Sequence, residues 1–176
     1  SVPPGSIIDS VTLTLTMSRS RVNDFNFTLH RVTSNWGEGT SNADANEGGG
    51  ANSTTNDATW IHTFYPASLW TTPGGNFNST ASAATLVGKS QGAFTWSSTP
   101  QMVADVQSWL NAPASNFGWM LRGPEGLRSA KRFNSRENAD IPSRPALMIQ
   151  FTSGGPQIFN WIGTGAGGSF HDPANW

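Results

Sequence analysis

Residues Val11–Met17, with the sequence VTLTLTM, alternate apolar and polar side chains without interruption. Successive side chains of a strand point to opposite faces, so this pattern predicts a strand with one buried face and one wet face. Phe25–Val32, with the sequence FNFTLHRV, repeats the alternation after a short polar break. We therefore expect these two strands to pair or to lie in facing sheets.

Shorter strands are predicted along the rest of the chain, each bounded by Gly, Pro, Asn or Ser. They cover residues 59–65, 92–96, 118–122, 130–134 and 146–152. Nothing alternates strand with helix, which argues against a parallel sheet. The predicted fold class is all-β, an antiparallel jelly-roll-like β-sandwich with one short α-helix.

That helix is expected at about residues 99–111, where the period of the apolar residues changes. Apolar side chains at 102, 103, 106, 109 and 110 share one helical face. Thr99 is the predicted N-cap, Pro100 suits the first helical position, and Pro113 ends the helix.

The composition of the 176 residues excludes several classes of protein. Eight Trp and ten Phe are too many for a disordered chain, and a net charge of −1 provides no long-range field to attract nucleic acid or anionic lipid. There is no cysteine, which rules out disulfides and thiol nucleophiles, and no apolar run is long enough for a spanning helix. We expect neither nucleic acid nor a membrane as a partner.

The chain is expected to be one sandwich module over residues 1–152, followed by a Gly-rich linker and the start of a further segment over residues 153–176. Both ends look cut from a longer protein, since the chain opens without Met. Sequons at Asn26, Asn52 and Asn78 are compatible with export, although such triplets arise by chance in a chain rich in Asn, Ser and Thr.

Residues 37–57 hold almost nothing apolar larger than Ala and are predicted to form a long surface loop. Its acidic side chains Asp44, Glu47 and Asp57 are oxygen ligands of the kind that Ca²⁺ prefers. The spacing of an EF-hand loop is missing, and simple solvation of a polar loop is the alternative. No other cofactor is expected.

Catalytic signals are weak. The three histidines are scattered, and no nucleophile elbow, P-loop or dinucleotide motif occurs. Glu38 and Glu137 are the two candidate carboxylates for glycosidic chemistry, which needs a pair about 5–10 Å apart. An ion pair of either with Arg132 or Arg136 is the alternative. We predict a protein that is not an enzyme.

Tryptophan is the most informative residue type. Trp36 and Trp70 lie in Gly-, Ser-, Thr- and Pro-rich loop sequence, and an exposed indole offers a flat apolar face to a sugar ring. We predict carbohydrate contacts by these two residues, with Asn35 and Tyr65 as further candidates. The alternative is that each indole folds back to plug one end of the sandwich. Six of the eight tryptophans fall within the sandwich portion, more than one core needs: Trp36, Trp60, Trp70, Trp96, Trp109 and Trp119.

Several ordered motifs over about residues 2–152 resemble the bacterial and archaeal domain called DNRLRE. They are IDSVTLTL from Ile8, LHRVTSNWGEGT over Leu29–Thr40, ATW over Ala58–Trp60, the helix over Val103–Leu110, NFGWMLR over Asn116–Arg122, FNSRE over Phe133–Glu137 and RPAL over Arg144–Leu147. The resemblance implies a jelly roll similar to carbohydrate-binding modules, without catalysis, in a secreted or cell-surface protein. The tail ending in DPANW resembles the opening of repeats in autotransporter-like surface proteins.

Domains of this family usually have further strands before the turn at Pro3–Ser6, where this chain starts. The resemblance therefore implies an open sheet edge, and an open edge is a template for pairing with another chain. The tail residues Phe159, Trp161, Ile162 and Trp176 are candidate donors. Two functions are thus predicted: polysaccharide binding through aromatic loop residues and, as the alternative, a structural subunit of an extracellular filament or surface assembly held by donor-strand pairing.

Overall fold

The first sheet is built along β1 (Ile7–Ser20), the strand that contains the VTLTLTM stretch. The structure is a computed structural model that describes residues 1–20, 23–42, 50–125 and 128–154. β6 (Gly92–Trp96) pairs antiparallel with one side of β1. Two strands share the other side end to end: β9 (Ala146–Thr152) along residues 7–14 and β8 (Lys131–Phe133) along residues 17–20.

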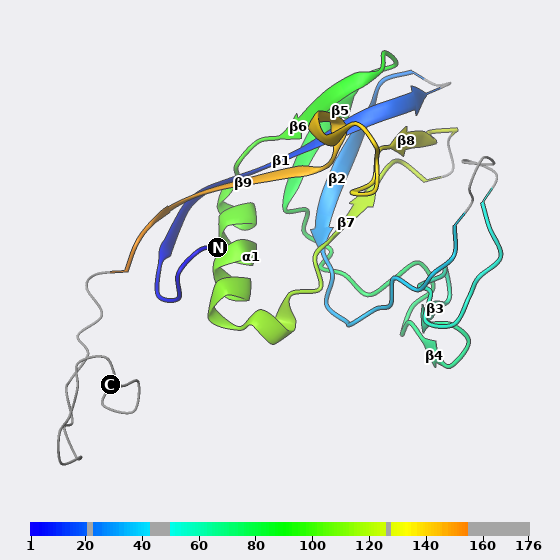
Figure 1. Ribbon diagram of the computed structural model, residues 1–176, viewed down its shortest axis with the longest axis horizontal. Helices are drawn as coiled ribbons and strands as arrows, with labels where there is room; N and C mark the ends of the chain where they lie inside the picture. Colours follow the sequence, from blue (N-terminus) through cyan, green and yellow to red (C-terminus); the bar gives the residue numbers. More distant parts are fainter. Residues whose placement is uncertain (21–22, 43–49, 126–127, 155–176) are drawn as a thin grey trace.

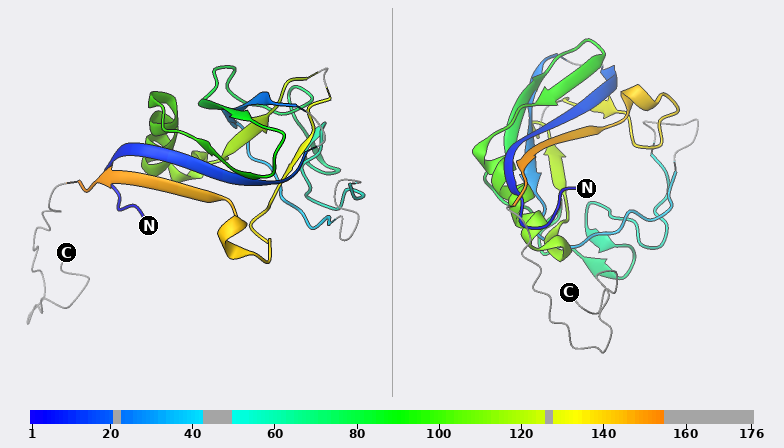
Figure 2. Two further views of the ribbon diagram at one scale, coloured as in Figure 1. Left: turned by 90° about the horizontal axis from the view of Figure 1, so that it is seen from above. Right: turned by 60° about the vertical axis from the view of Figure 1, so that its left-hand side comes forward.

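The second sheet places β2 (Phe25–Arg31) between β5 (Ala83–Val87) and β7 (Trp119–Arg122), again antiparallel. The two sheets face each other, so the first two predicted strands lie in facing sheets (Figures 1 and 2). Their alternation has the expected meaning, because Val11 and Met17 of β1 and Leu29 of β2 are buried in one shared core. The predicted all-β sandwich with one α-helix is confirmed.

Trp96 lies at the centre of that core and joins the two sheets. Its side chain is fully buried, and its indole Nε1–H donates a hydrogen bond to the carbonyl of Phe27 on the opposite sheet at 2.9 Å. Phe133 of β8 meets the indole edge-on, with ring centroids 6.2 Å apart. A large apolar body with a satisfied polar atom is what a buried tryptophan requires.

The helix α1 (Pro100–Asn111) begins where the sequence predicts it. The Thr99 hydroxyl accepts a hydrogen bond from the Met102 amide at 3.0 Å, and Pro100 occupies the first turn. Met102, Val106 and Trp109 are its buried apolar residues. Buried Asp105 also attaches the helix to the second sheet, since its carboxylate accepts hydrogen bonds from the Ser82 hydroxyl, the Trp119 indole and the Gln101 amide.

Predicted and observed secondary structure differ in three main respects. The strand expected at 59–65 is reduced to β3 (His62–Phe64), which forms a small hairpin with β4 (Ser68–Leu69). β5 was not predicted, because its sequence AATLV carries mostly small side chains and little alternation. Two short 3₁₀ helices, η2 (Pro113–Ser115) and η3 (Ile141–Ser143), also lie outside the prediction.

No helix in the described residues is long and apolar enough to cross a membrane.

Candidate functional site

The candidate site lies on a loop lobe, which we define as residues 33–42 and 50–80. β3 and β4 belong to this lobe, which lies beside one end of the sandwich (Figure 1). It adjoins the sandwich through the bridge between Val32 and Phe77 and through the Asn78 amide, which donates to the carbonyl of Arg31 on β2 at 2.9 Å. The described parts of the long loop predicted at 37–57 contain no helix or strand, as expected.

Asp57 organises the first half of the loop lobe. Its buried carboxylate accepts hydrogen bonds from the Thr54 amide at 2.5 Å and from the Thr54 hydroxyl at 3.2 Å. The Ser41 amide approaches the other oxygen at 3.4 Å. Hydrogen bonding by the Thr54 amide lowers the pKa of Asp57, although burial opposes that shift. Gly39 has a positive φ of 61°, and a Cβ there would lie 1.7 Å from the carboxylate, so no larger residue fits.

Two other polar side chains fix the second half of the lobe. The Asn76 carbonyl oxygen accepts from the amides of Thr71 and Thr72 at 3.1 and 3.3 Å. The Thr59 hydroxyl accepts from the amides of Ile61 and His62 at 3.2 and 3.0 Å. Short polar side chains that bond nearby backbone in this way stabilise turns without a regular ladder.

Trp36 is exposed on the lobe, as a ligand contact requires, with 41% of its surface accessible. Its indole Nε1–H donates to the carbonyl of Phe117 at 2.8 Å, which fixes the ring near the start of β7. Asn35 is also exposed, but its side-chain oxygen accepts a hydrogen bond from the Trp36 amide at 2.9 Å. Asn35 therefore helps to orient the Trp36 backbone.

Trp70 is in a different environment, since only 9% of its surface is accessible. Its indole Nε1–H donates to the carbonyl of Thr59 at 2.9 Å. Tyr65 is half-buried and meets the His62 ring edge-on, with centroids 5.1 Å apart. Trp70 therefore folds inward, as the alternative expects, but into the loop lobe and not into the end of the sandwich, whereas Trp36 stays exposed.

Trp60 is the exposed indole that sequence reasoning missed. It was counted among the tryptophans of the sandwich and placed in the strand predicted at 59–65, yet 67% of its surface is accessible. Its ring lies against Gly74, where a Cβ would approach the indole to 2.9 Å. Exposed Ile61 and Leu69 belong to the same hairpin region. The available signal was the adjacent apolar pair Trp60–Ile61, which breaks strand alternation.

The structure gives a partial view of the predicted calcium ligands. Asp57 uses both carboxylate oxygens for hydrogen bonds within the loop lobe. Asp44 and Glu47 lie outside the described residues. Within the described ranges, no group of three or more His, Asp or Glu side chains is placed to hold a metal ion.

Both carboxylates considered for catalysis bind the same arginine. The Arg136 guanidinium pairs with Glu38 at 2.9 Å and with Glu137 at 2.8 Å. These two carboxylates raise the pKa of Arg136, and the hydrogen bond with Glu137 has the largest effect. All three side chains are well exposed, and the Glu38 contact joins the loop lobe to residues after β8. The arrangement matches the ion-pair alternative.

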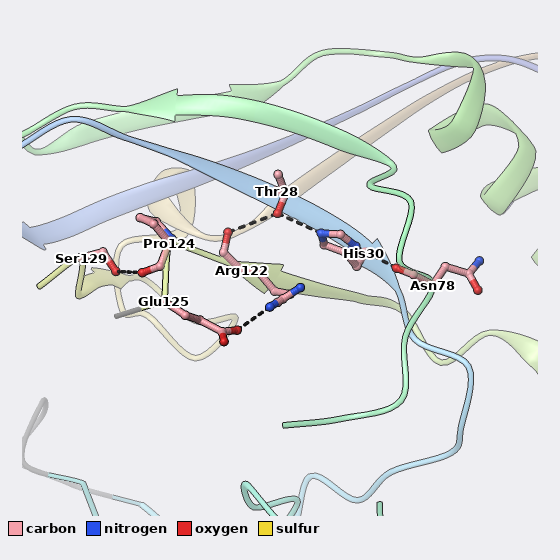
Figure 3. A network of polar contacts seen from close by, with 7 residues as sticks. All are labelled: Thr28, His30, Asn78, Arg122, Pro124, Glu125 and Ser129. Carbon is pink, nitrogen blue, oxygen red and sulfur yellow. Dashed lines mark hydrogen bonds and ion pairs between the residues drawn. The ribbon is translucent and has the colours of Figure 1, made fainter. Parts of the chain in front are cut away.

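Both ring nitrogens of the buried histidine His30 have hydrogen-bond partners, one on its own strand and one in the loop lobe (Figure 3). One ring nitrogen contacts the carbonyl of Asn78 at 2.8 Å and the other contacts the Thr28 hydroxyl at 3.0 Å. Arg122 on the adjacent strand forms an ion pair with Glu125 and stacks its guanidinium over Phe77, 4.6 Å from the ring centroid. This network holds the lobe onto the second sheet and offers no free catalytic base.

The remaining predictions concern exposed asparagines and the tail. The sequon residues Asn26, Asn52 and Asn78 are all exposed. The candidate donor residues Phe159, Trp161, Ile162 and Trp176 lie outside the described residues.

We compared the chain with known proteins and found no relative. No family model matches the chain, and no curated protein or solved structure matches it either. The resemblance to DNRLRE domains therefore stays a prediction from the motifs.

Proposed function

We propose that this protein is a non-catalytic polysaccharide-binding module of an exported surface protein, with Trp60 as the central contact. The observation that carries the proposal is the indole of Trp60, two-thirds exposed on the loop lobe. Large exposed apolar residues clustered on one surface mark interaction sites. A flat aromatic face suits the axial hydrogens of a sugar ring.

The proposed platform is supported from beneath. Gly74 lies directly against the Trp60 ring, and the Gly74 amide donates to the Trp60 carbonyl at 2.7 Å. Trp70 is buried directly after β4, and its amide donates to the carbonyl of Ile61, the neighbour of Trp60, at 3.1 Å. A ring held in place in the free protein loses little entropy on binding. Trp36 is the second exposed indole of the lobe, and we assign it a flanking contact.

The chemistry of the surroundings favours a neutral glycan. The protein has a net charge of −1 and only 12% charged residues, so no strong field attracts an anionic polymer. Exposed Thr71 and Thr72, close in sequence to the Trp60 support, offer hydroxyl groups to a sugar. Glu38 and Glu137 are held by Arg136, which supports a binding role without hydrolysis. The proposal includes no cofactor, and calcium in the 44–57 loop remains a prediction.

Affinity electrophoresis in gels that contain soluble neutral polysaccharides tests this proposal. We expect retention of the wild-type protein by at least one glycan, loss of most of that retention in Trp60→Ala, and partial loss in Trp36→Ala. Trp60→Phe keeps an aromatic face and should retain more than Trp60→Ala. Leu86→Ala is the matched control, because Leu86 is 58% exposed on β5 of the second sheet and lies outside the lobe.

Equal retention of Trp60→Ala and wild type would overturn the assignment of the platform. Failure of the wild-type protein to bind any neutral glycan would overturn the function itself. Circular dichroism of each variant separates loss of binding from loss of fold.

A second candidate function is that of a structural subunit in an extracellular assembly. It is favoured by one observation: β9 has no strand on its outer edge within the described part of the chain. The tail predicted to be the donor lies outside the described residues, so the free edge of β9 alone supports this candidate.

A further inference from the structure

β9 forms an unprotected edge of the first sheet. One side of β9 pairs with β1, and no other strand of the described ranges pairs with it. Figures 1 and 2 show β9 running along the rim of the sheet, with the η3 turn near its start. A free edge presents unpaired backbone groups that another strand can bind.

The core of the sandwich is also incompletely covered at this edge. Register places Leu147 opposite Leu13 and Phe151 opposite Ile8, so both β9 side chains lie on the core-facing side of the sheet. Ile8 is 3% exposed, whereas Leu147 is 48% exposed and Phe151 38% exposed. Burial therefore falls sharply from β1 to β9, on the same face of one sheet.

The usual devices that block edge pairing are missing from β9. Its seven residues, ALMIQFT, include no charge and no proline. The register irregularity between the two strands falls at Ile8 to Ser10 and belongs to β1. Natural edge strands are commonly protected by charged side chains, proline or bulges. An apolar edge without them is suited to strand pairing.

We propose that β9 pairs antiparallel with β9 of a second copy of this chain, so that the two first sheets form one continuous sheet. The strand is self-complementary about Ile149. Pairing about a two-fold axis beside Ile149 sets Leu147 opposite the partner's Phe151 and Ile149 opposite the partner's Ile149. Each half-exposed core-facing side chain then meets an apolar one, and the interface closes as a dimer.

The charges at the two ends of β9 agree with this arrangement. Arg144 precedes the strand, and Asp9 lies at its far end, where its carboxylate accepts a hydrogen bond from the Thr152 hydroxyl at 2.9 Å. Antiparallel pairing brings the Arg144 end of one copy toward the Asp9 end of the other, although Asp9 lies one strand inward on β1 and the Arg144 guanidinium also donates to the Asn138 carbonyl at 2.7 Å. These two charges are opposite in sign, and the uncharged strand between them adds no repulsion.

Charge substitutions on the outer face of β9 test both the edge and its register. Met148 and Gln150 are exposed on the face opposite the core, and the proposed register sets each opposite the other across the axis. In the variant Met148→Lys/Gln150→Lys, the lysine at 148 of each copy lies opposite the lysine at 150 of the other copy. The variant Met148→Glu/Gln150→Glu opposes two negative charges in the same way. Like charges in opposed positions destabilise strand pairing.

Sedimentation velocity over a range of concentrations is the measurement. We expect the sedimentation coefficient of the wild-type chain to rise with concentration from the monomer value to the dimer value. The dissociation constant of the dimer should be at least about tenfold higher for each double variant. An equimolar mixture of the lysine and glutamate variants should recover the dimer. The matched control is Ala84→Lys/Leu86→Lys, which carries two lysines at exposed positions of β5, an edge strand of the second sheet, and should dimerise like wild type.

Three results would overturn the proposal. A wild-type chain that stays monomeric at high concentration would show that β9 does not pair with itself. A dimer unaffected by both double variants would use another surface. Loss of the dimer on deletion of residues 155–176 alone would identify the tail as the occupant of the edge. None of these measurements involves a glycan, so they are independent of the proposed polysaccharide binding.

Discussion

The sandwich and the loop lobe are stabilised by different interactions. In the sandwich, strands from two sheets bury a continuous apolar core that includes Val11, Met17, Leu29, Val87 and Trp96. In the described part of the lobe, Trp70 is the one buried hydrophobic residue. The lobe depends instead on polar side chains that hydrogen-bond to backbone amides.

This difference explains why exposed apolar residues have different meanings in the two regions. In the sandwich, half-exposed Leu147 and Phe151 are core-facing residues at an edge that lacks a neighbour. In the lobe, Trp60 is two-thirds exposed even though Gly74 packs against its ring. The first situation favours pairing with a strand, and the second favours a flat ligand.

Truncation of the central tryptophan tests the apolar core of the sandwich and should have the largest effect. We expect Trp96→Ala to lower the free energy of unfolding by about 3–5 kcal/mol, because it leaves a cavity and removes the hydrogen bond to the Phe27 carbonyl. Such a loss is comparable with the whole stability of many domains. Urea unfolding followed by circular dichroism measures it.

Trp96→Phe is the control, since it keeps most of the volume and should cost clearly less. A loss below about 1 kcal/mol for Trp96→Ala would contradict a core centred on this indole.

Trp60 and Trp70 of the loop lobe should differ in their effect on stability when each is changed to alanine. We expect Trp70→Ala to cost about 2–3 kcal/mol, because its indole is buried and bonded to the Thr59 carbonyl. Trp60→Ala should change the unfolding free energy by less than about 0.5 kcal/mol, since its indole is mostly in water. Thermal and urea unfolding of the matched pair measure this contrast, and equal costs would refute the distinction between support and platform.

Sequence patterns predicted the sandwich well where strands carry strict alternation or a helix carries a clear cap. β9 was predicted at 146–152 with its observed bounds, and Thr99 caps α1 as expected. β5 escaped prediction because Ala83 and Ala84 give no hydrophobic contrast, and its position depends on pairing with β2. Long-range pairing of that kind cannot be obtained from a local pattern.

The lobe was less predictable, because its indoles have similar sequence surroundings and different burial. Trp36 and Trp70 both lie among small polar residues, yet one is exposed and the other folds inward. Trp60 was assigned to a strand, but β3 begins two residues later at His62. Asp57 was proposed as a calcium ligand, whereas its oxygens accept hydrogen bonds from the Thr54 amide and hydroxyl. Such side-chain-to-backbone bonds depend on a turn geometry that composition does not specify.

As the pH falls, protonation of Asp57 should destabilise the loop lobe at a higher pH than the sandwich. Hydrogen bonding from the Thr54 amide lowers the pKa of this carboxyl below its ordinary value of 3.8, so the charged form is the one the folded lobe favours. The resulting stabilisation is present above the unfolded pKa and disappears as pH falls through the folded pKa. We therefore expect the lobe to be insensitive to pH from 7 down to about 5 and to loosen only in stronger acid.

Amide NMR of Thr54 during an acid titration measures this effect, because its N–H donates directly to the carboxylate. The signal of Thr54 should shift with a midpoint below 3.8, while amides in β1 and β2 stay unchanged over the same range. Asp57→Asn keeps an acceptor oxygen but loses the charge, so it should abolish that transition and weaken the lobe modestly at neutral pH. A midpoint at or above 3.8, or a transition that persists in Asp57→Asn, would mean that the lobe is not organised around this carboxylate. The polar contacts of Asp57 would then contribute little to the lobe, in contrast to the apolar contacts that stabilise the sandwich.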